Sequence, residues 1–142
     1  MLRVHHLLAA KHSKVITVKP SSSVLEALQL MAEHNVGALP VVQEHSLVGI
    51  FSERDYARKV VLLGKNSTQT HVSQIMSQNV LTVGPQSTVE ECMHVMSEKR
   101  IRHLPVLEDS KLVGILSIGD IVKTMIQEQL LKIEQLESYI KT

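Results

Sequence analysis

Hydrophobic residues recur along this chain in an order that predicts a small mixed unit of strands and helices. The β-branched run 15–18 ends at a proline and a serine cluster, which is typical of a short strand. Apolar residues at three- and four-residue steps over 24–31 then indicate one face of an amphipathic helix. Two apolar runs, 39–42 and 47–51, are separated by polar residues and predict a β-hairpin, and a second helix is expected over about 52–63.

The same pattern returns 65 residues later. Residues 80–126, laid on residues 15–61 without a gap, match identically at 18 of 47 positions, whereas ordinary composition gives about three matches by chance. The shared residues form three blocks: Val-x-Thr-Val-x-Pro, Leu-Pro-Val, and Leu-Val-Gly-Ile-x-Ser-x-x-Asp. A unit of this length buries too little core to fold well alone. We therefore predict an α+β fold in which two β-α-β-β-α repeats pack face to face with pseudo-two-fold symmetry, leaving related clefts between them.

This pattern divides the chain into five segments: 1–14 as an N-terminal segment, 15–63 as the first repeat, 64–79 as a linker with a short helix, 80–126 as the second repeat, and 127–142 as a C-terminal helical extension. Apolar residues continue at helical spacing through that extension, so the last helix is longer than the repeat requires. We expect it to pack on the N-terminal residues around Leu7 and Leu8, or on a second chain.

Composition excludes several classes of function. The net charge is +1 and three of the 142 residues are aromatic, which disfavours a nucleic-acid surface and base-stacking platforms. No targeting segment and no stretch long and apolar enough to span a membrane is found, so a cytoplasmic location is expected. The lone cysteine, Cys92, favours a reducing compartment. Cys92 also falls on the second helix stripe, which favours core packing. The eight histidines show no paired spacing typical of a metal site, so no metal is expected.

One polar motif occurs in both repeats, Ser52-x-x-Asp55 and Ser117-x-x-Asp120, where a strand is expected to run into a helix. A purely structural interpretation is a helix N-cap with an acid at the third helical position. A functional interpretation adds that such a carboxylate can accept hydrogen bonds from both hydroxyls of a ribose, while the helix start favours a phosphate. The glycine three residues before each serine would let a flat ring approach the strand. Both interpretations can hold together.

The two copies of these blocks resemble a tandem pair of cystathionine-β-synthase (CBS) domains, a Bateman module, over roughly residues 4–126. Segments 52–60 and 101–106 further resemble small stand-alone CBS-pair proteins of bacteria and plant organelles. The resemblance implies a non-catalytic binder of adenine nucleotides that signals to an unidentified regulated protein. AMP is the first candidate ligand, NAD(H) and ATP are further ones, and no catalytic cofactor is implied. It also implies a homodimer, as related modules pair into a flat disc.

The resemblance implies a role for each residue of the first cleft. The acid would hold the ribose, the serine would lie near the ribose or phosphate, and three consecutive residues of the second repeat would wall the adenine. Two arginines and a histidine would face the phosphate, since forked arginine donors suit an anion. The implied residues are Ser52, Arg54, Asp55, Leu81, Thr82, Val83, Arg102 and His103. Without the resemblance, the residues around Arg102 could equally form a solvated turn before a strand.

The second cleft would use the equivalent residues Thr17, Val18, Ala38, Ser117 and Asp120. Gly37 and Ala38 stand there in place of Arg102 and His103, so this cleft keeps the ribose acid and lacks the cations. We therefore predict that the clefts are unequal and that the Asp55 cleft is the better phosphate site.

Two other functions remain open at this point. The chain could be an interaction scaffold that dimerises and holds no ligand, although a scaffold needs no acid after each serine beyond capping. It could also be a nucleotide-handling enzyme, which would need a general base, and His103 is the candidate that the sequence offers. Gly-x-Gly-x-x-Gly, Gly-x-Ser-x-Gly and His-Glu-x-x-His motifs are absent, so we expect no enzyme activity.

Overall fold

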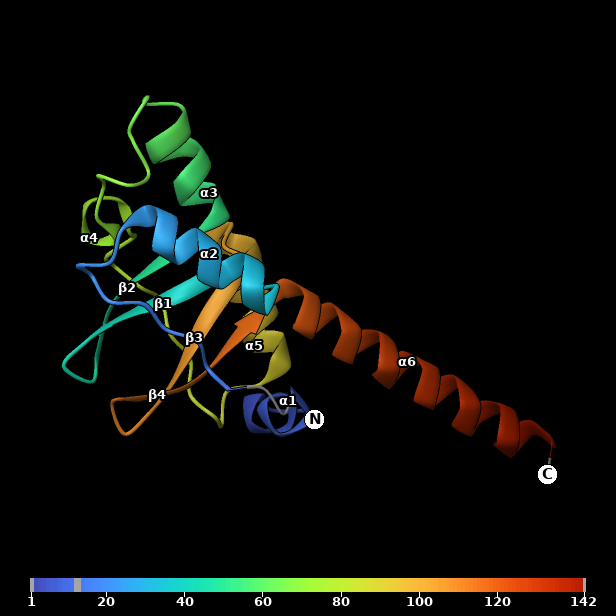
Figure 1. Cartoon of the computed structure of the whole chain (residues 1–142). Coiled ribbons are helices and arrows are strands. Elements are labelled where there is room, and N and C mark those ends of the chain that lie inside the picture. Colours follow the sequence, from blue (N-terminus) through green and yellow to red (C-terminus); the bar gives the residue numbers. More distant parts are fainter. Residues whose placement is uncertain (1, 12–13, 142) are drawn as a thin grey trace.

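The computed structural model describes residues 2–11 and 14–141 (Figure 1). The elements are α1 (Val4–Lys11), α2 (Val24–His34), β1 (Ala38–Gln43), β2 (Ser46–Ser52), α3 (Glu53–Asp55), the π-helix η1 (Tyr56–Val61), α4 (Val72–Ile75), α5 (Val89–Lys99), β3 (His103–Glu108), β4 (Lys111–Ser117) and α6 (Ile118–Lys141). Strands β1 and β2 form one antiparallel sheet, and β3 and β4 form the other. The predicted α+β fold with two related repeats is confirmed.

The hairpins of the two repeats are alike in detail. Each closes with a two-residue turn whose residues both have positive φ, Glu44 and His45 in the first repeat and Asp109 and Ser110 in the second. Turns of this kind match the right-handed twist of the flanking strands. Each hairpin also shifts register at the same place, between the fourth and fifth residues of its first strand. The repeat therefore extends to backbone irregularities that the residue pattern does not reveal.

Each repeat buries its own hydrophobic cluster. The first consists of Val18, Val24, Ala27, Met31, Leu39, Val41, Phe51, Val60, Val72 and Ile75. The second consists of Val4, Leu7, Val89, Cys92, Met96, Leu104, Val106, Leu116 and Ile121. The core position expected for Cys92 is confirmed, and burial raises the pKa of its thiol to about 11, with Glu91 adding to the effect.

The predicted opening strand of each repeat is wrong. In place of strands over 15–18 and 80–83 there are single parallel bridges, which pair Val18 with Val41 and Val83 with Val106. Val18 donates to the carbonyl of Pro40 and accepts from the amide of Val42. The preceding bond of a parallel ladder, to the carbonyl of Ile16, would need an N–H from residue 40, which proline does not have. Pro105 lacks the same donor in the second repeat. In each repeat the β-branched run therefore pairs with the hairpin at a single residue.

Two short helices cover the strand glycines. The side chain of Leu8, in α1, lies where a Cβ on Gly114 would project, and the side chain of Met76, just after α4, lies where a Cβ on Gly49 would project. The expectation that these glycines admit a flat ring is therefore wrong, because side chains of the same protein already fill the space. Helices α1 and α4 thus perform the same packing role in the two repeats.

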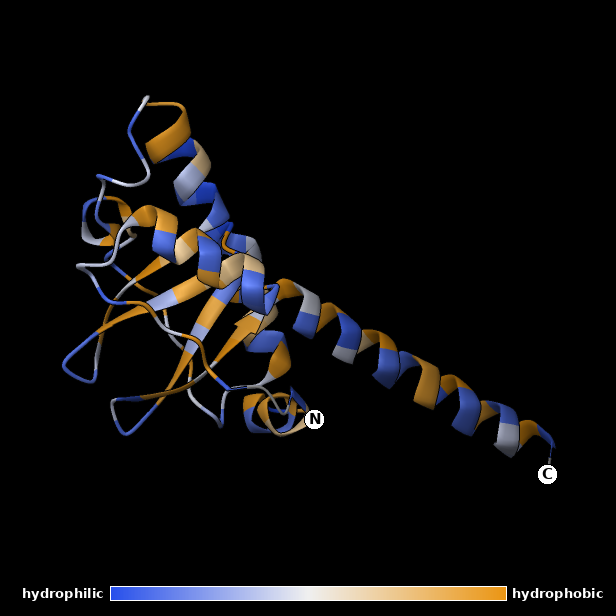
Figure 2. Cartoon of the chain, in the orientation of Figure 1, coloured by the Kyte–Doolittle hydropathy of each residue, from blue (hydrophilic) through white to orange (hydrophobic). Residues whose placement is uncertain are grey.

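The last helix extends away from the rest of the molecule (Figure 1). Ile121 is its buried residue, whereas apolar side chains from Ile126 to Ile140 are half or more exposed. Figure 2 shows hydrophobic and hydrophilic positions alternating along the ribbon of this helix. At the start of α6, Ile121 shares the second core cluster with Leu7, and Leu8 packs against that cluster. The expected packing on Leu7 and Leu8 is therefore confirmed for the first turn of α6 and wrong for the apolar residues from Ile126 to Ile140, which are exposed. None of the described helices is both long enough and apolar enough to cross a membrane.

Candidate functional site

The two Ser-x-x-Asp motifs, one in each repeat, cap their helices as the structural interpretation predicts. One oxygen of Asp55 (Oδ2) accepts hydrogen bonds from the amide and hydroxyl of Ser52, at 3.0 and 3.1 Å. The amide of Asp55 donates in return to the hydroxyl of Ser52. Ser117 and Asp120 make the same reciprocal amide bonds at 2.9 and 3.1 Å. Capping therefore uses one carboxylate oxygen in each repeat.

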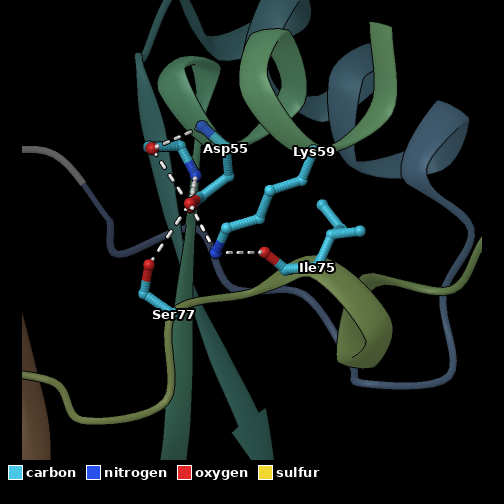
Figure 3. Close-up of polar contacts among 5 residues, drawn as sticks. Asp55, Lys59, Ile75 and Ser77 are labelled. Carbon is cyan, nitrogen blue, oxygen red and sulfur yellow. Dashed lines mark hydrogen bonds and ion pairs between the residues drawn. The ribbon is translucent and has the colours of Figure 1, made fainter. Parts of the chain in front are cut away.

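The other oxygen of Asp55 is held by two further groups (Figure 3). Oδ1 accepts a hydrogen bond from the Ser77 hydroxyl at 3.2 Å and forms an ion pair with the Lys59 ammonium at 3.2 Å. Lys59 also donates to the carbonyl of Ile75, so it ties η1 to the linker. The Asp55 side chain is 9% exposed. A hydroxyl that bonds Oδ1 could therefore replace the neutral bond from Ser77 while the Lys59 ammonium stays on the same oxygen.

A cavity of about 550 Å³ opens beside Asp55, which is within the range of small-molecule sites. Both repeats and the linker line it, through Gly37, Ile50, Ser52, Glu53, Arg54, Asp55, Ser77, Asn79, Val80, Leu81, Ile101, Arg102 and His103. Six of the eight residues predicted for the first cleft belong to this lining: Ser52, Arg54, Asp55, Leu81, Arg102 and His103. The structure thus brings the predicted ribose acid and the predicted phosphate-facing residues around one space.

The remaining two residues predicted for this cleft lie outside its lining. Thr82 is exposed, and the backbone amide and carbonyl of Val83 bond to β3. The wall is formed instead by 79–81, and Ser77 belongs to the same segment. Ser77 and Asn79, which belong to the linker, were missed because the alignment of the repeats at an offset of 65 begins after them, at residue 80. Helices α1 and α4 are related by an offset of 68 residues, at which Val4 corresponds to Val72, and not by the offset of 65 that relates the repeats.

One wall of the cavity carries basic groups. The Arg54 guanidinium donates to the carbonyl of Arg100 at 2.9 Å, which places it across the boundary between the repeats. Arg100 itself has a left-handed backbone conformation and caps the end of α5. Arg102 is exposed and His103 half-buried. Burial lowers the pKa of His103, Lys11 and Arg102 lower it further, and Asp120 raises it in part.

The second carboxylate, that of Asp120, has a different partner. Oδ2 accepts a hydrogen bond from the Lys11 ammonium at 2.9 Å, and the same ammonium donates to the carbonyl of Ile115 at 2.9 Å. Burial alone would raise the pKa of Asp120, but bonds from the Ser117 backbone and from Lys11 outweigh it and lower the pKa. Sequence reasoning missed Lys11, because it lies outside the repeat pattern.

The other residues predicted for the second cleft are spread among different environments. Thr17 is exposed, whereas Ala38 is buried and pairs with Ser52 in the first hairpin. Val18 is buried in the first core cluster, and β1 uses its backbone groups. Among the residues that the structure describes, no group of three or more His, Cys, Asp or Glu side chains could hold a metal ion.

Two repeats with a ligand-sized cavity between them define a paired-domain module. The chain belongs to the CBS domain family, whose model matches residues 9–62 and 72–127. It is similar to the CBS domain-containing protein CBSX3, mitochondrial, of Arabidopsis thaliana, with 40% identity over 124 residues, 84% of this chain and 60% of that protein. It is also 38% identical over 109 residues to the CBS domain-containing protein YhcV of Bacillus subtilis (strain 168), covering 77% of each.

Solved structures give the same family. A signal-transduction protein with CBS domains from Burkholderia ambifaria MC40-6, described as putative, is 45% identical, with a TM-score of 0.86 over 90% of this chain and 96% of that one. The CBS domain pair of protein MJ0100, solved with 5'-methylthioadenosine and S-adenosyl-L-methionine, is 29% identical, with a TM-score of 0.81 over 90% of this chain and 98% of that one. CBS-domain proteins are generally regulatory, and adenine-containing ligands are found in this family.

Proposed function

We propose that this chain is a non-catalytic regulatory module that binds an adenine nucleotide in the Asp55 cleft. AMP is the first candidate, and NAD(H) and ATP are further ones. The observation that carries the proposal is the composition of one cavity: Asp55 lies among its lining residues together with Arg54, Arg102 and His103. A nucleotide needs an acceptor for its ribose hydroxyls and cations for its phosphate, and this cavity supplies both.

The base would contact the aliphatic wall of the cavity. Ile50, Val80, Leu81 and Ile101 line it, and each offers apolar surface to a flat ring. This wall explains how a chain with three aromatic residues could still bind adenine. The phosphate would then point toward Arg102 and His103. A bound anion would favour protonation of His103, whose pKa burial lowers in the free protein.

A thermal-shift and calorimetry panel of AMP, ADP, ATP, NAD, NADH and S-adenosylmethionine tests this proposal. A nucleotide at 100 times its dissociation constant should raise the free energy of unfolding by about 2.7 kcal/mol. Inosine monophosphate is the matched control for the base, because it keeps the ribose and phosphate and changes the ring edge. If no adenine compound shifts the melting temperature or releases binding heat, the proposed nucleotide binding is refuted and the interaction scaffold becomes the favoured function.

A homodimer is part of the same proposal. The apolar stripe of α6, which we define as Val122, Ile126, Leu130, Ile133, Leu136 and Ile140, is from 42% to 79% exposed. A contiguous apolar face of this kind marks an interaction surface. A second copy is the occupant that we propose, because the stripe has the three- and four-residue spacing with which two helices pack. A hexameric CBS-CP12 protein from cyanobacteria, 30% identical with a TM-score of 0.76 over 85% of this chain, supports assembly in the family.

Sedimentation or light scattering tests the dimer directly. Wild-type protein should have twice the mass of one 15.8 kDa chain. Ile126→Glu should produce monomers, because it buries a charge in the proposed interface. Gln127→Glu adds the same charge beside the stripe and should leave the dimer intact. A monomeric wild type, or equal effects of the two variants, would remove the dimer from the proposal.

Regulation requires that nucleotide binding change a surface which a partner protein contacts, since a ligand shifts an equilibrium only through different affinities for its two states. We place this module in the cytoplasm, where adenine nucleotides are abundant. Fractionation of cells that express the tagged protein would test that location.

A further inference from the structure

The two capping carboxylates are each paired with a lysine, but the lysines come from different parts of the chain. Lys59 reaches Asp55 from one turn further along the same helical segment. Its position in the second repeat is occupied by Thr124, which carries no charge. Lys11 instead reaches Asp120 from α1, 109 residues away. The second cleft therefore receives its cation from outside the repeat.

The place of Lys11 in the first cleft is taken by Asn79. At the offset of 68 that relates α1 to the linker, Val4 corresponds to Val72, Leu8 to Met76 and Lys11 to Asn79. The correspondence holds in the structure, since Val4 and Val72 are both fully buried and Leu8 and Met76 both cover a strand glycine. Asn79 lines the open cavity beside Asp55. Lys59, by contrast, is not among the lining residues of that cavity and leaves it open.

We propose that Lys11 closes the Asp120 cleft to a ribose, so that each chain binds one nucleotide, in the Asp55 cleft. The Lys11 ammonium bonds both to Asp120 and to the carbonyl of Ile115, the equivalent of the cavity-lining Ile50. A ribose that bonds both oxygens of Asp120 would have to displace this ammonium from Oδ2 and leave it without its carboxylate partner. A neutral hydroxyl makes a weaker bond to a carboxylate than an ammonium does.

The backbone of α1 is fixed, which keeps Lys11 in place. Val4 and Leu7 are buried in the second core cluster. The amides of Val4 and His5 donate to the carbonyls of Ser87 and Pro85, both at 2.9 Å. Removing Lys11 from the cleft therefore requires either rotation of its side chain away from two bonds or release of a packed helix. Both changes oppose binding at Asp120.

This inference rests on the proposed function, and calorimetric stoichiometry with AMP tests it. Wild type should bind one AMP per chain. Lys11→Asn, which copies the residue of the first cleft, should bind two, and adding Asp120→Ala should return the value to one. Lys11→Met, which keeps the length of the side chain without its charge, is a second variant in case asparagine disturbs α1. Lys14→Asn, an exposed lysine three residues further on, is the control and should bind one.

The outcomes separate the two proposals. Two AMP molecules bound to wild type would overturn the inference and leave the proposed function standing. One AMP bound to wild type and one bound to each folded Lys11 variant would also overturn the inference and leave the proposed function standing. Two on wild type and one on Lys11→Asn would show that Lys11 is a ligand-binding cation instead. No AMP on any variant would refute the proposed function, and the inference with it.

Discussion

The Asp55 cleft and the Asp120 cleft begin from the same nine-residue block, yet the structure makes them different. Both acids cap a helix with the same serine bonds. Asp55 then turns its second oxygen to Ser77 and Lys59 beside a 550 Å³ cavity, whereas Asp120 is bonded by Lys11. The difference teaches that a repeated motif fixes local backbone geometry, while the segments packed against it decide whether a ligand can bind.

The largest expected effect separates the two acids. Asp55→Asn should weaken AMP binding about 100-fold, because a ribose loses charge-assisted hydrogen bonds that contribute roughly 1.5–3 kcal/mol each. Asn keeps a side-chain oxygen that can accept the bond from the Ser52 amide, so the fold should persist. Asp120→Asn is the matched control and should change the affinity less than about threefold. Calorimetry of both variants checks this comparison, and equal losses would contradict the assignment of the site to the Asp55 cleft.

The strand glycines provide the next test. A Cβ at Gly49 would lie 2.5 Å from Met76 Sδ and 3.0 Å from the backbone carbonyl oxygen of Ser77, whereas at Gly114 its nearest neighbours are atoms of the Leu8 side chain. Gly49→Ala should therefore lower the free energy of unfolding by about 1–3 kcal/mol, and Gly114→Ala by less, because a side-chain end yields more easily than backbone. Urea denaturation measures both. A larger loss of unfolding free energy for Gly114→Ala than for Gly49→Ala would contradict the described packing of Leu8 and Met76 against the two glycines.

A smaller effect concerns Arg102, which has no arginine equivalent in the Asp120 cleft. Arg102→Gly installs the residue found at the equivalent position of the first repeat, Gly37. It should weaken AMP binding about tenfold through the loss of a phosphate contact. Binding of adenosine should not change, because adenosine has no phosphate. Titrations with both ligands make this a test of role as well as of affinity. If adenosine binding falls as much as AMP binding, Arg102 supports the fold of the cleft and does not face the phosphate.

The smallest effect is a pH dependence that comes from His103. Because burial, Lys11 and Arg102 hold its pKa below the ordinary value of 6.5, the folded protein binds fewer protons than the unfolded chain just below that pH. The free energy of unfolding should thus fall as the pH drops from 7.5 through 6.5 toward the lower folded-state pKa. His103→Gln should lose less stability over this interval. Asp120 does not contribute there, since its lowered pKa acts below its ordinary 3.8. A variant with the same slope as wild type would contradict the lowered pKa.

Much of the fold could be predicted from the sequence, because local pattern and the internal repeat constrain the same elements. The hairpins and helix caps follow from turn and capping residues that act within a few positions of one another. The opening strands could not be predicted from their β-branched residues, since the missing N–H that shortens them belongs to Pro40 and Pro105 in a neighbouring strand. Propensity describes one strand at a time, whereas a ladder needs donors from two.

The site was partly predictable for the same reason. Ser52, Asp55 and Arg102 lie in or beside blocks that the repeat emphasises. Ser77 and Lys11 lie in segments where the repeat offset changes, and they meet the acids only through packing of α4 and α1. Contacts that join residues 22 and 109 positions apart leave no local pattern. An alignment that allowed a three-residue shift would have placed Lys11 opposite Asn79.

The most direct test of unequal clefts is a crystal structure of the wild-type protein grown with AMP in excess. The ribose should lie on Asp55 with the phosphate toward Arg102, and the Lys11 ammonium should remain bonded to Asp120. AMP bound at Asp120 with Lys11 displaced, whether or not the Asp55 cleft is also filled, would contradict the account.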